Sequence, residues 1–178
     1  MFLAAWLLNS IRLAAALGIA LLAMQAPAIT REYQAALLQL VRSSNQEIAQ
    51  RKASAQRFYG IAPQEDEGRF LAQLRAVEPS NAETLAAALE RERSLQASYD
   101  RIDHSPDLLR PIAAAKDIGV DDGGSRRQIA QTVFHSFAPQ LDLSSAAAVY
   151  GLIGLFLGSL IGELVTAALF PQRHRFAR

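Results

Sequence analysis

The sequence predicts an all-α protein with two transmembrane helices, N- and C-terminal, that flank a helical, hairpin-like extramembrane domain. Apolar residues gather at the two ends of the 178-residue chain, whereas charges of both signs recur every few positions between Thr30 and Asp142. Within that segment the apolar residues return at intervals of three and four, as in amphipathic helices. The expected division is 1–28 (interfacial segment and first span), 29–143 (helical domain), 144–170 (second span) and 171–178 (basic tail).

The first span is expected over residues 11–28. This end of the chain is apolar apart from Asn9, Ser10 and Arg12, and a long arginine side chain near a helix end can extend to the lipid headgroups. A signal peptide cleaved after small residues at 26–28 is the alternative. Because no basic side chain precedes Arg12, the sequence favours an uncleaved helix.

The domain is expected to begin with one long amphipathic helix over residues 29–59, which no glycine or proline interrupts before Gly60. A short helix over 65–77 follows, and Pro79 stops it. Ser80 and Glu83 then have the spacing of a capping box for a helix over 81–103. The leucines of that helix share one face, so it is expected to return antiparallel against the first long helix.

Two shorter helices complete the expected domain. The first opens at Ser105 and ends at Gly119, and the second runs from a capping Ser125 to Phe137. Between them lies Asp-Asp-Gly-Gly at 121–124. A turn is favoured there over a calcium loop, because the alternating acids and terminal glutamate of such a loop are missing.

The second span is the clearest element of the sequence. Residues 146–170 contain one charge, and about 20 apolar residues are enough to cross a bilayer. Small residues form a strip on one face of this helix, where a second helix can approach closely: Gly151, Gly154, Gly158 and Gly162. The helix that packs on this strip could belong to the first span of the same chain, to a neighbouring copy or to a different protein.

Glu163 lies inside the second span, where an unpaired carboxylate is unfavourable. Counted inward from the ends of the two spans that adjoin the central domain, Arg12 and Glu163 reach similar depths in an antiparallel pair. We therefore expect an intramembrane ion pair that fixes the register of the two helices. A proton or ion relay is the alternative.

The inventory of reactive side chains is small. Cysteine is absent, which excludes disulfides, thiolate metal sites and cysteine nucleophiles. His104, His135 and His174 are scattered, and no phosphate loop, zinc spacing or catalytic triad is recognisable. No basic stripe interleaved with aromatic residues suggests nucleic acid. We expect no cofactor, no metal and no enzymatic activity.

Orientation is predicted from the basic residues that flank the spans, because cytoplasmic loops are enriched in them. The tail carries three arginines, and Arg12 lies on the same side if the chain crosses twice. Both termini are therefore expected in the cytoplasm and the central domain on the other side of the membrane, which is the periplasm if the cell is a Gram-negative bacterium.

The chain resembles the proteobacterial family of membrane proteins catalogued as domain of unknown function 2937. The likeness is in the order of short motifs: Gln-Ala-Pro-Ala at 25–28, Tyr-Gln at 33–34, Leu-Leu-Arg-Pro at 108–111, and Phe-Ala-Pro-Gln-Leu-Asp-Leu at 137–143, before a glycine-rich span. The resemblance implies a bacterial inner membrane and brings no catalytic residues.

The functional hypothesis is a non-enzymatic inner-membrane protein, acting as a structural or accessory subunit. It would assemble through the glycine strip and the periplasmic domain, as a homo-oligomer or within a larger membrane complex. The alternative is a homo-oligomeric channel or pore, whose conductance would depend on Gly158 or Glu163.

Overall fold

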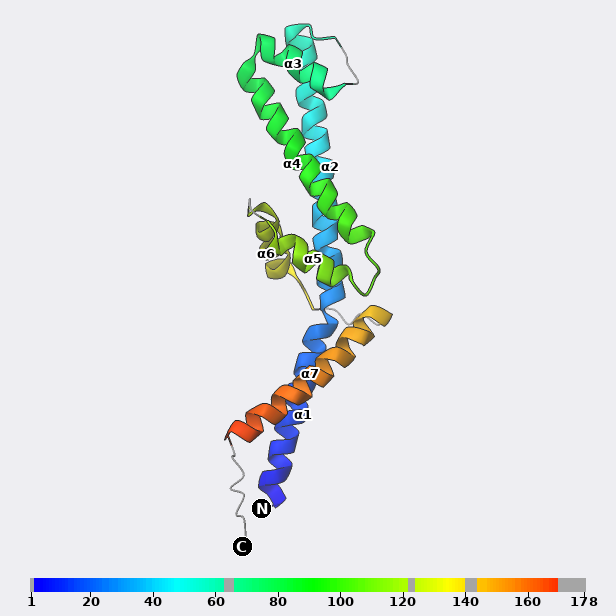
Figure 1. Cartoon of the computed structure of the whole chain (residues 1–178), viewed down its shortest axis with the longest axis vertical. Coiled ribbons are helices and arrows are strands. Elements are labelled where there is room, and N and C mark those ends of the chain that lie inside the picture. Colours follow the sequence, from blue (N-terminus) through cyan, green and yellow to red (C-terminus); the bar gives the residue numbers. More distant parts are fainter. Residues whose placement is uncertain (1, 63–65, 122–123, 140–143, 170–178) are drawn as a thin grey trace. The chain divides into compact units, whose positions relative to one another are not determined.

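A computed structural model describes residues 2–62, 66–121, 124–139 and 144–169 of the chain. All regular secondary structure in these ranges is helical (Figure 1), which confirms the predicted all-α class. The helices are α1 (Phe2–Met24), α2 (Ala26–Tyr59), α3 (Glu67–Val77), α4 (Pro79–Asp103), α5 (Arg110–Gly119), α6 (Ser125–Ser136) and α7 (Ser145–Leu169). The predicted basic tail and the end of the 137–143 motif lie outside the described residues.

The chain folds as two compact units, which we call the terminal and the central unit. The terminal unit comprises Met1–Arg31, Asp107–Pro111 and Ser136–Arg178. The central unit comprises Glu32–Pro106 and Ile112–His135. A short piece from the middle of the sequence therefore belongs to the terminal unit.

Two stretches of helix are long and apolar enough to cross a bilayer, by length and composition: Asn9–Tyr59 and Ser145–Val165. The first is a run of 51 residues rather than a separate flanking span, because α1 continues almost directly into α2. A turn at Gln25 separates them, and the N–H of Ile29 resumes the helical pattern by donating to the Gln25 carbonyl at 2.9 Å. Pro27 is the second residue of α2, where a helix does not need its missing N–H.

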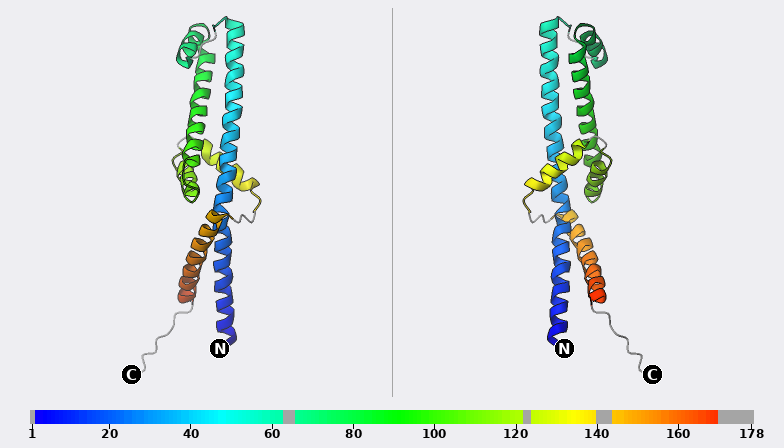
Figure 2. Two further views of the ribbon diagram at one scale, coloured as in Figure 1. Left: turned by 90° about the vertical axis from the view of Figure 1, so that its right-hand side faces the viewer. Right: turned by 90° about the vertical axis from the view of Figure 1, so that its left-hand side faces the viewer.

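Helices α2 and α4 of the central unit lie side by side and run antiparallel (Figure 2). Their apolar faces meet in two core clusters. The first joins the end of α2 to α3 and the start of α4: Ile48, Ala55, Ile61, Phe70, Leu74, Ala82, Leu85 and Leu89. The second joins the first turns of α2 within the central unit to α5, to α6 and to the end of α4: Tyr33, Leu37, Val41, Leu95, Ile102, Ala114 and Ala130.

Three predicted helix starts are wrong. Helix α5 begins at Arg110 and not at Ser105, because residues 104–109 are not helical. Helix α4 begins at Pro79 with Glu78 as its N-cap, because the fixed φ of proline suits the first turn of a helix. Ser80 lies inside that turn, so it forms no capping box. Helix α6 begins at Ser125 itself, and its cap is the Asp121 carboxylate, whose Oδ2 accepts the N–H groups of Arg126 and Arg127 at 2.7 and 3.1 Å.

Candidate functional site

The glycine strip of α7 packs against α1 of the same chain. Gly151, Gly154, Gly158 and Gly162 are all buried in the structure, and so are Ala16 and Ala20 on the facing side of α1, at 4% and 8% exposure. Small residues on both helices allow their backbones to approach closely, which is the usual way that helices pack in lipid. Of the partners left open by the sequence, the structure therefore shows the first span.

The contact is close along the strip except at Gly162, and it already begins at Gly151, where a methyl group would lie 2.7 Å from Met24 Cγ. A methyl group on Gly154 would lie 2.6 Å from Ala23 Cβ, and one on Gly158 would lie 2.8 Å from Ala16 Cα. At Gly162 the nearest atom would be 3.6 Å away, on Arg12. The two helices therefore diverge toward the termini of the chain.

Arg12 and Glu163 lie where the helices have begun to diverge. The Arg12 Nη2 group donates to Glu163 Oε1 at 2.8 Å, and the side chains are 31% and 65% exposed. Two opposite charges in hydrogen-bond contact are far better tolerated in a low-dielectric medium than either charge alone. The pair therefore also fixes the register of α1 against α7.

A groove of about 590 Å³ opens beside this ion pair. Its lining residues are Trp6, Asn9, Ser10, Arg12, Leu13, Ala16, Leu155 and Ser159. Asn9 and Ser159 are exposed, and neither side chain has a hydrogen bond to another residue in the described part of the chain. Polar groups on membrane helices usually find partners on neighbouring helices, so the groove offers hydrogen-bonding groups to a further molecule.

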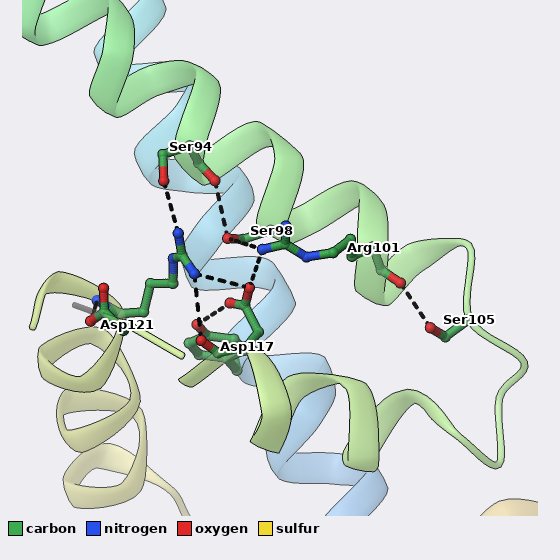
Figure 3. Close-up of polar contacts among 8 residues, drawn as sticks. Ser94, Ser98, Arg101, Ser105, Asp117 and Asp121 are labelled. Carbon is green, nitrogen blue, oxygen red and sulfur yellow. Dashed lines mark hydrogen bonds and ion pairs between the residues drawn. The ribbon is translucent and has the colours of Figure 1, made fainter. Parts of the chain in front are cut away.

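The central unit contains a second polar cluster, centred on Asp117 of α5 (Figure 3). The Asp117 side chain is only 1% exposed. Its Oδ1 atom accepts from Arg101 Nη2 of α4 at 2.5 Å and from Arg126 Nη1 of α6 at 3.4 Å. Its Oδ2 atom accepts from the Tyr33 hydroxyl of α2 at 3.1 Å. One buried carboxylate thus links four helices.

The serines of α4 complete this cluster. Arg126 donates to Ser94 Oγ at 2.9 Å, and Arg101 donates to Ser98 Oγ at 3.2 Å (Figure 3). Burial of the Tyr33 hydroxyl, followed by the charge of Asp117 and the hydrogen bond to it, raises the Tyr33 pKa well above its usual range. The tyrosine is therefore a neutral donor, and the arrangement is that of a structural clamp.

A smaller ion-pair cluster joins α2, α3 and α4. Glu67 accepts from Lys52 Nζ at 2.9 Å and from Arg93 Nη2 at 2.6 Å. The hydrogen bond from Lys52, and then the contact with Arg93, lower the pKa of the Glu67 carboxyl. These contacts orient α3 against the helical hairpin.

His104 and His135 lie at the ends of different helices, α4 and α6. His104 is the C-cap residue of α4, and its Nδ1 atom lies 2.7 Å from the Asp100 carbonyl. Among the described residues, no group of three or more His, Asp or Glu side chains has the arrangement of a metal site. His174 lies outside the described residues.

A comparison with known protein families identifies the family of this chain. The sequence profile of the family described as "Protein of unknown function (DUF2937)" matches residues 7–175. The chain belongs to this family. The match covers both candidate spans and the central unit of this DUF2937 protein, and it confirms the family that the short motifs suggested. No curated protein and no solved structure matches the chain.

Sequence reasoning missed the Asp117 cluster. An isolated aspartate in a short helix resembles many surface acids, and its partners come from helices that only the tertiary fold brings together. One local signal was present, because apolar Ala113 and Ala114 lie four and three residues before Asp117, on the same face of the helix. An acid on the apolar face of a helix indicates a buried ion pair.

Proposed function

We propose that this protein is a non-enzymatic subunit of the bacterial inner membrane, with α1 and α7 as its membrane anchor and the helical domain in the periplasm. Its role is structural or accessory, through association with a second copy or with other subunits of a membrane complex. The observation that carries this proposal is the groove between the two apolar helices, where the side chains of Asn9 and Ser159 are exposed. Asn9 and Ser159 can be satisfied there by a polar group on another transmembrane helix.

The packing of the glycine strip refines the proposal. Since α1 covers that strip within one chain, the strip closes the anchor and does not face a second protein. Association then uses the groove and the surface of the central unit. Large apolar side chains are exposed on that unit, as expected for a surface that a partner covers: Phe58, Val77, Ile112, Val120 and Phe134.

The deciding experiment is extraction of the full chain from its native membrane into nanodiscs, followed by mass determination of the intact particle. Foreign subunits in fixed stoichiometry support an accessory role, and a particle with several copies of this chain alone supports self-assembly. Ser159→Leu, which fills the groove, should release the partner, whereas Ala148→Leu, an exposed position that does not line the groove, should not. A single chain without partners would contradict the proposal.

Location and topology have a separate test, which the lack of cysteine makes simple. A single cysteine at the exposed position Gln46 of α2 should react in intact cells with a maleimide that crosses the outer but not the inner membrane. Reaction only after the inner membrane is opened would place the central unit in the cytoplasm and overturn the proposed orientation.

A homo-oligomeric channel is the second candidate. It is favoured by the 65% exposure of the Glu163 side chain, because a ring of such carboxylates from several copies could line a cation pathway. Purified protein in planar bilayers should then conduct cations, and Glu163→Gln should reduce that conductance. Absence of conductance from an oligomeric preparation would exclude the channel.

A further inference from the structure

We propose that the segment Asp107–Pro111 is a membrane-interface contact, with Leu108 and Leu109 inserted among the phospholipid chains beside α7. The inference rests on the proposed membrane anchoring and extends it to a third part of the sequence. Although the segment comes from between α4 and α5, it belongs to the same compact unit as α1 and α7.

A specific hydrogen bond ties the segment to α7. The Tyr150 hydroxyl donates to the Leu108 carbonyl at 2.9 Å. Tyr150 is in the second turn of α7, which begins at Ser145. Because side chains on a helix lean toward its N-terminus, the hydroxyl points back toward the start of α7, which lies at the bilayer surface when α7 spans the membrane. Tyrosine is enriched at this depth, where its ring is in apolar surroundings and its hydroxyl reaches polar groups.

The side chains of the segment match an interface. Leu108 and Leu109 are 44% and 51% exposed, and charged residues stand on either side of them. Arg110 Nη1 and Asp107 Oδ1 are 3.2 Å apart. Two leucines between charged neighbours can enter the acyl region while the charges stay among the headgroups. The hydrogen bond from Tyr150 replaces the bond to water that the Leu108 carbonyl loses when the segment enters the acyl region.

Lipid is the occupant that the geometry favours over a protein. A leucine pair fixed to the second turn of a lipid-embedded helix meets the bilayer first. Stable protein interfaces bury about 800 Å² on each partner, which is far more than two half-exposed leucine side chains provide. The exposed leucines therefore need no partner protein to be covered.

The test uses single cysteines in the otherwise cysteine-free full chain, each labelled with an environment-sensitive fluorophore in nanodiscs of phosphatidylcholine and phosphatidylglycerol. Leu109→Cys reports on the segment. Phe156→Cys, at a 73% exposed position of α7, is the lipid control, and Phe58→Cys, at a 79% exposed position of α2, is the control for an apolar site in the central unit. Quenching is measured with lipids that carry a nitroxide high or low on the acyl chain, and with aqueous iodide.

At Leu109 we expect strong quenching by the shallow nitroxide, weaker quenching by the deep one, and little quenching by iodide. Strong iodide quenching would overturn the inference. Protection from both iodide and lipid nitroxides would also overturn it, since a protein would then cover the segment. If Phe156 is quenched by lipid and Leu109 is not, the interface contact fails while the membrane anchoring stands; if neither is quenched, the anchoring fails as well.

A second variant tests the tether. Tyr150→Phe keeps the ring and removes the hydroxyl, which should shift the equilibrium between inserted and released segment about fivefold toward release. Lipid quenching at Leu109 should fall and iodide quenching should rise. Tyr59→Phe, a partly exposed tyrosine at the end of α2, should change neither. Identical quenching in Tyr150→Phe and the parent chain would show that Tyr150 does not hold the segment.

Discussion

Gly158→Ala tests the closest contact of the glycine strip with the backbone of α1. The added methyl group would lie 2.8 Å from Ala16 Cα and 3.1 Å from the Ala16 carbonyl oxygen. Both are backbone atoms, so no side chain can rotate away. The 2.8 Å distance is about 0.6 Å short of the 3.4 Å at which ordinary contact begins, and the helices must therefore separate by roughly that amount.

The expected loss follows from that separation. A gap of about 0.5–1 Å forfeits a quarter to a half of the dispersion energy of each contact, and overpacking of this kind typically costs about 1–3 kcal/mol. Alanine also favours a helix over glycine by up to about 1 kcal/mol. Gly18→Ala measures this second effect alone, because nothing lies within 4 Å of a methyl group there. Relative to Gly18→Ala, Gly158→Ala should weaken the helix pair by about 1–3 kcal/mol.

The assay is energy transfer between fluorophores on cysteines introduced at the exposed positions Leu13 and Leu160, during titration of bicelles with dodecyl sulfate. Gly162→Ala is the matched control, because its methyl group would find its nearest atom at an ordinary 3.6 Å. Gly158→Leu should weaken the pair further. If Gly158→Ala separates at the same detergent fraction as Gly162→Ala, the packing of α1 on α7 is not the one described.

Three further outcomes follow from the polar contacts. In the same assay, Glu163→Gln should weaken the helix pair by about 1 kcal/mol, because Arg12 loses its counter-charge, and exchanging the two residues should restore it; no recovery would contradict direct pairing. Asp117→Ala should lower the free energy of unfolding, measured by urea titration, by about 3–5 kcal/mol, because the mostly buried Arg126 side chain and the buried Tyr33 hydroxyl lose their acceptor; Asp107→Ala, at an exposed ion pair, should change it by less than about 1 kcal/mol. A comparable effect at both aspartates would rule out the buried clamp. The pKa of Tyr33 is raised in the folded state, so its contribution to the free energy of unfolding is complete below the unfolded-state pKa of about 10 and is lost as the pH rises above that value. Tyr33→Phe should flatten this alkaline decline in stability, and an unchanged decline would show that another group causes it.

The helices were predictable wherever one local signal dominated. The apolar run of α7 is long enough to predict a single long helix. Gly60, at φ 65°, ends α2 in the left-handed conformation that glycine favours. The capping pattern of Ser80 and Glu83 misled because it competed with Pro79 one residue earlier. Two starting signals within a few residues cannot be ranked without the packing that selects one of them.

The two polar sites differ in how far the sequence predicts them. Arg12 and Glu163 stand out as charges in apolar runs, and counting residues along two straight helices was enough to expect them together. The Asp117 clamp draws on four helices, and its partners lie among many other charged residues of the central unit. Its geometry depends on crossing positions that the periodicity of single helices does not encode.

The contact between Arg12 and Glu163 joins residues 151 positions apart in the sequence. At a synthesis rate of about 5–20 residues per second, α1 leaves the ribosome about 8–30 s before the part of α7 that receives it. During that interval Arg12 lacks the Glu163 carboxylate, and the alanine face of α1 has no glycine strip to cover it. A chain that ends before α7 therefore carries Arg12 without its carboxylate partner and an alanine face on α1 that nothing covers.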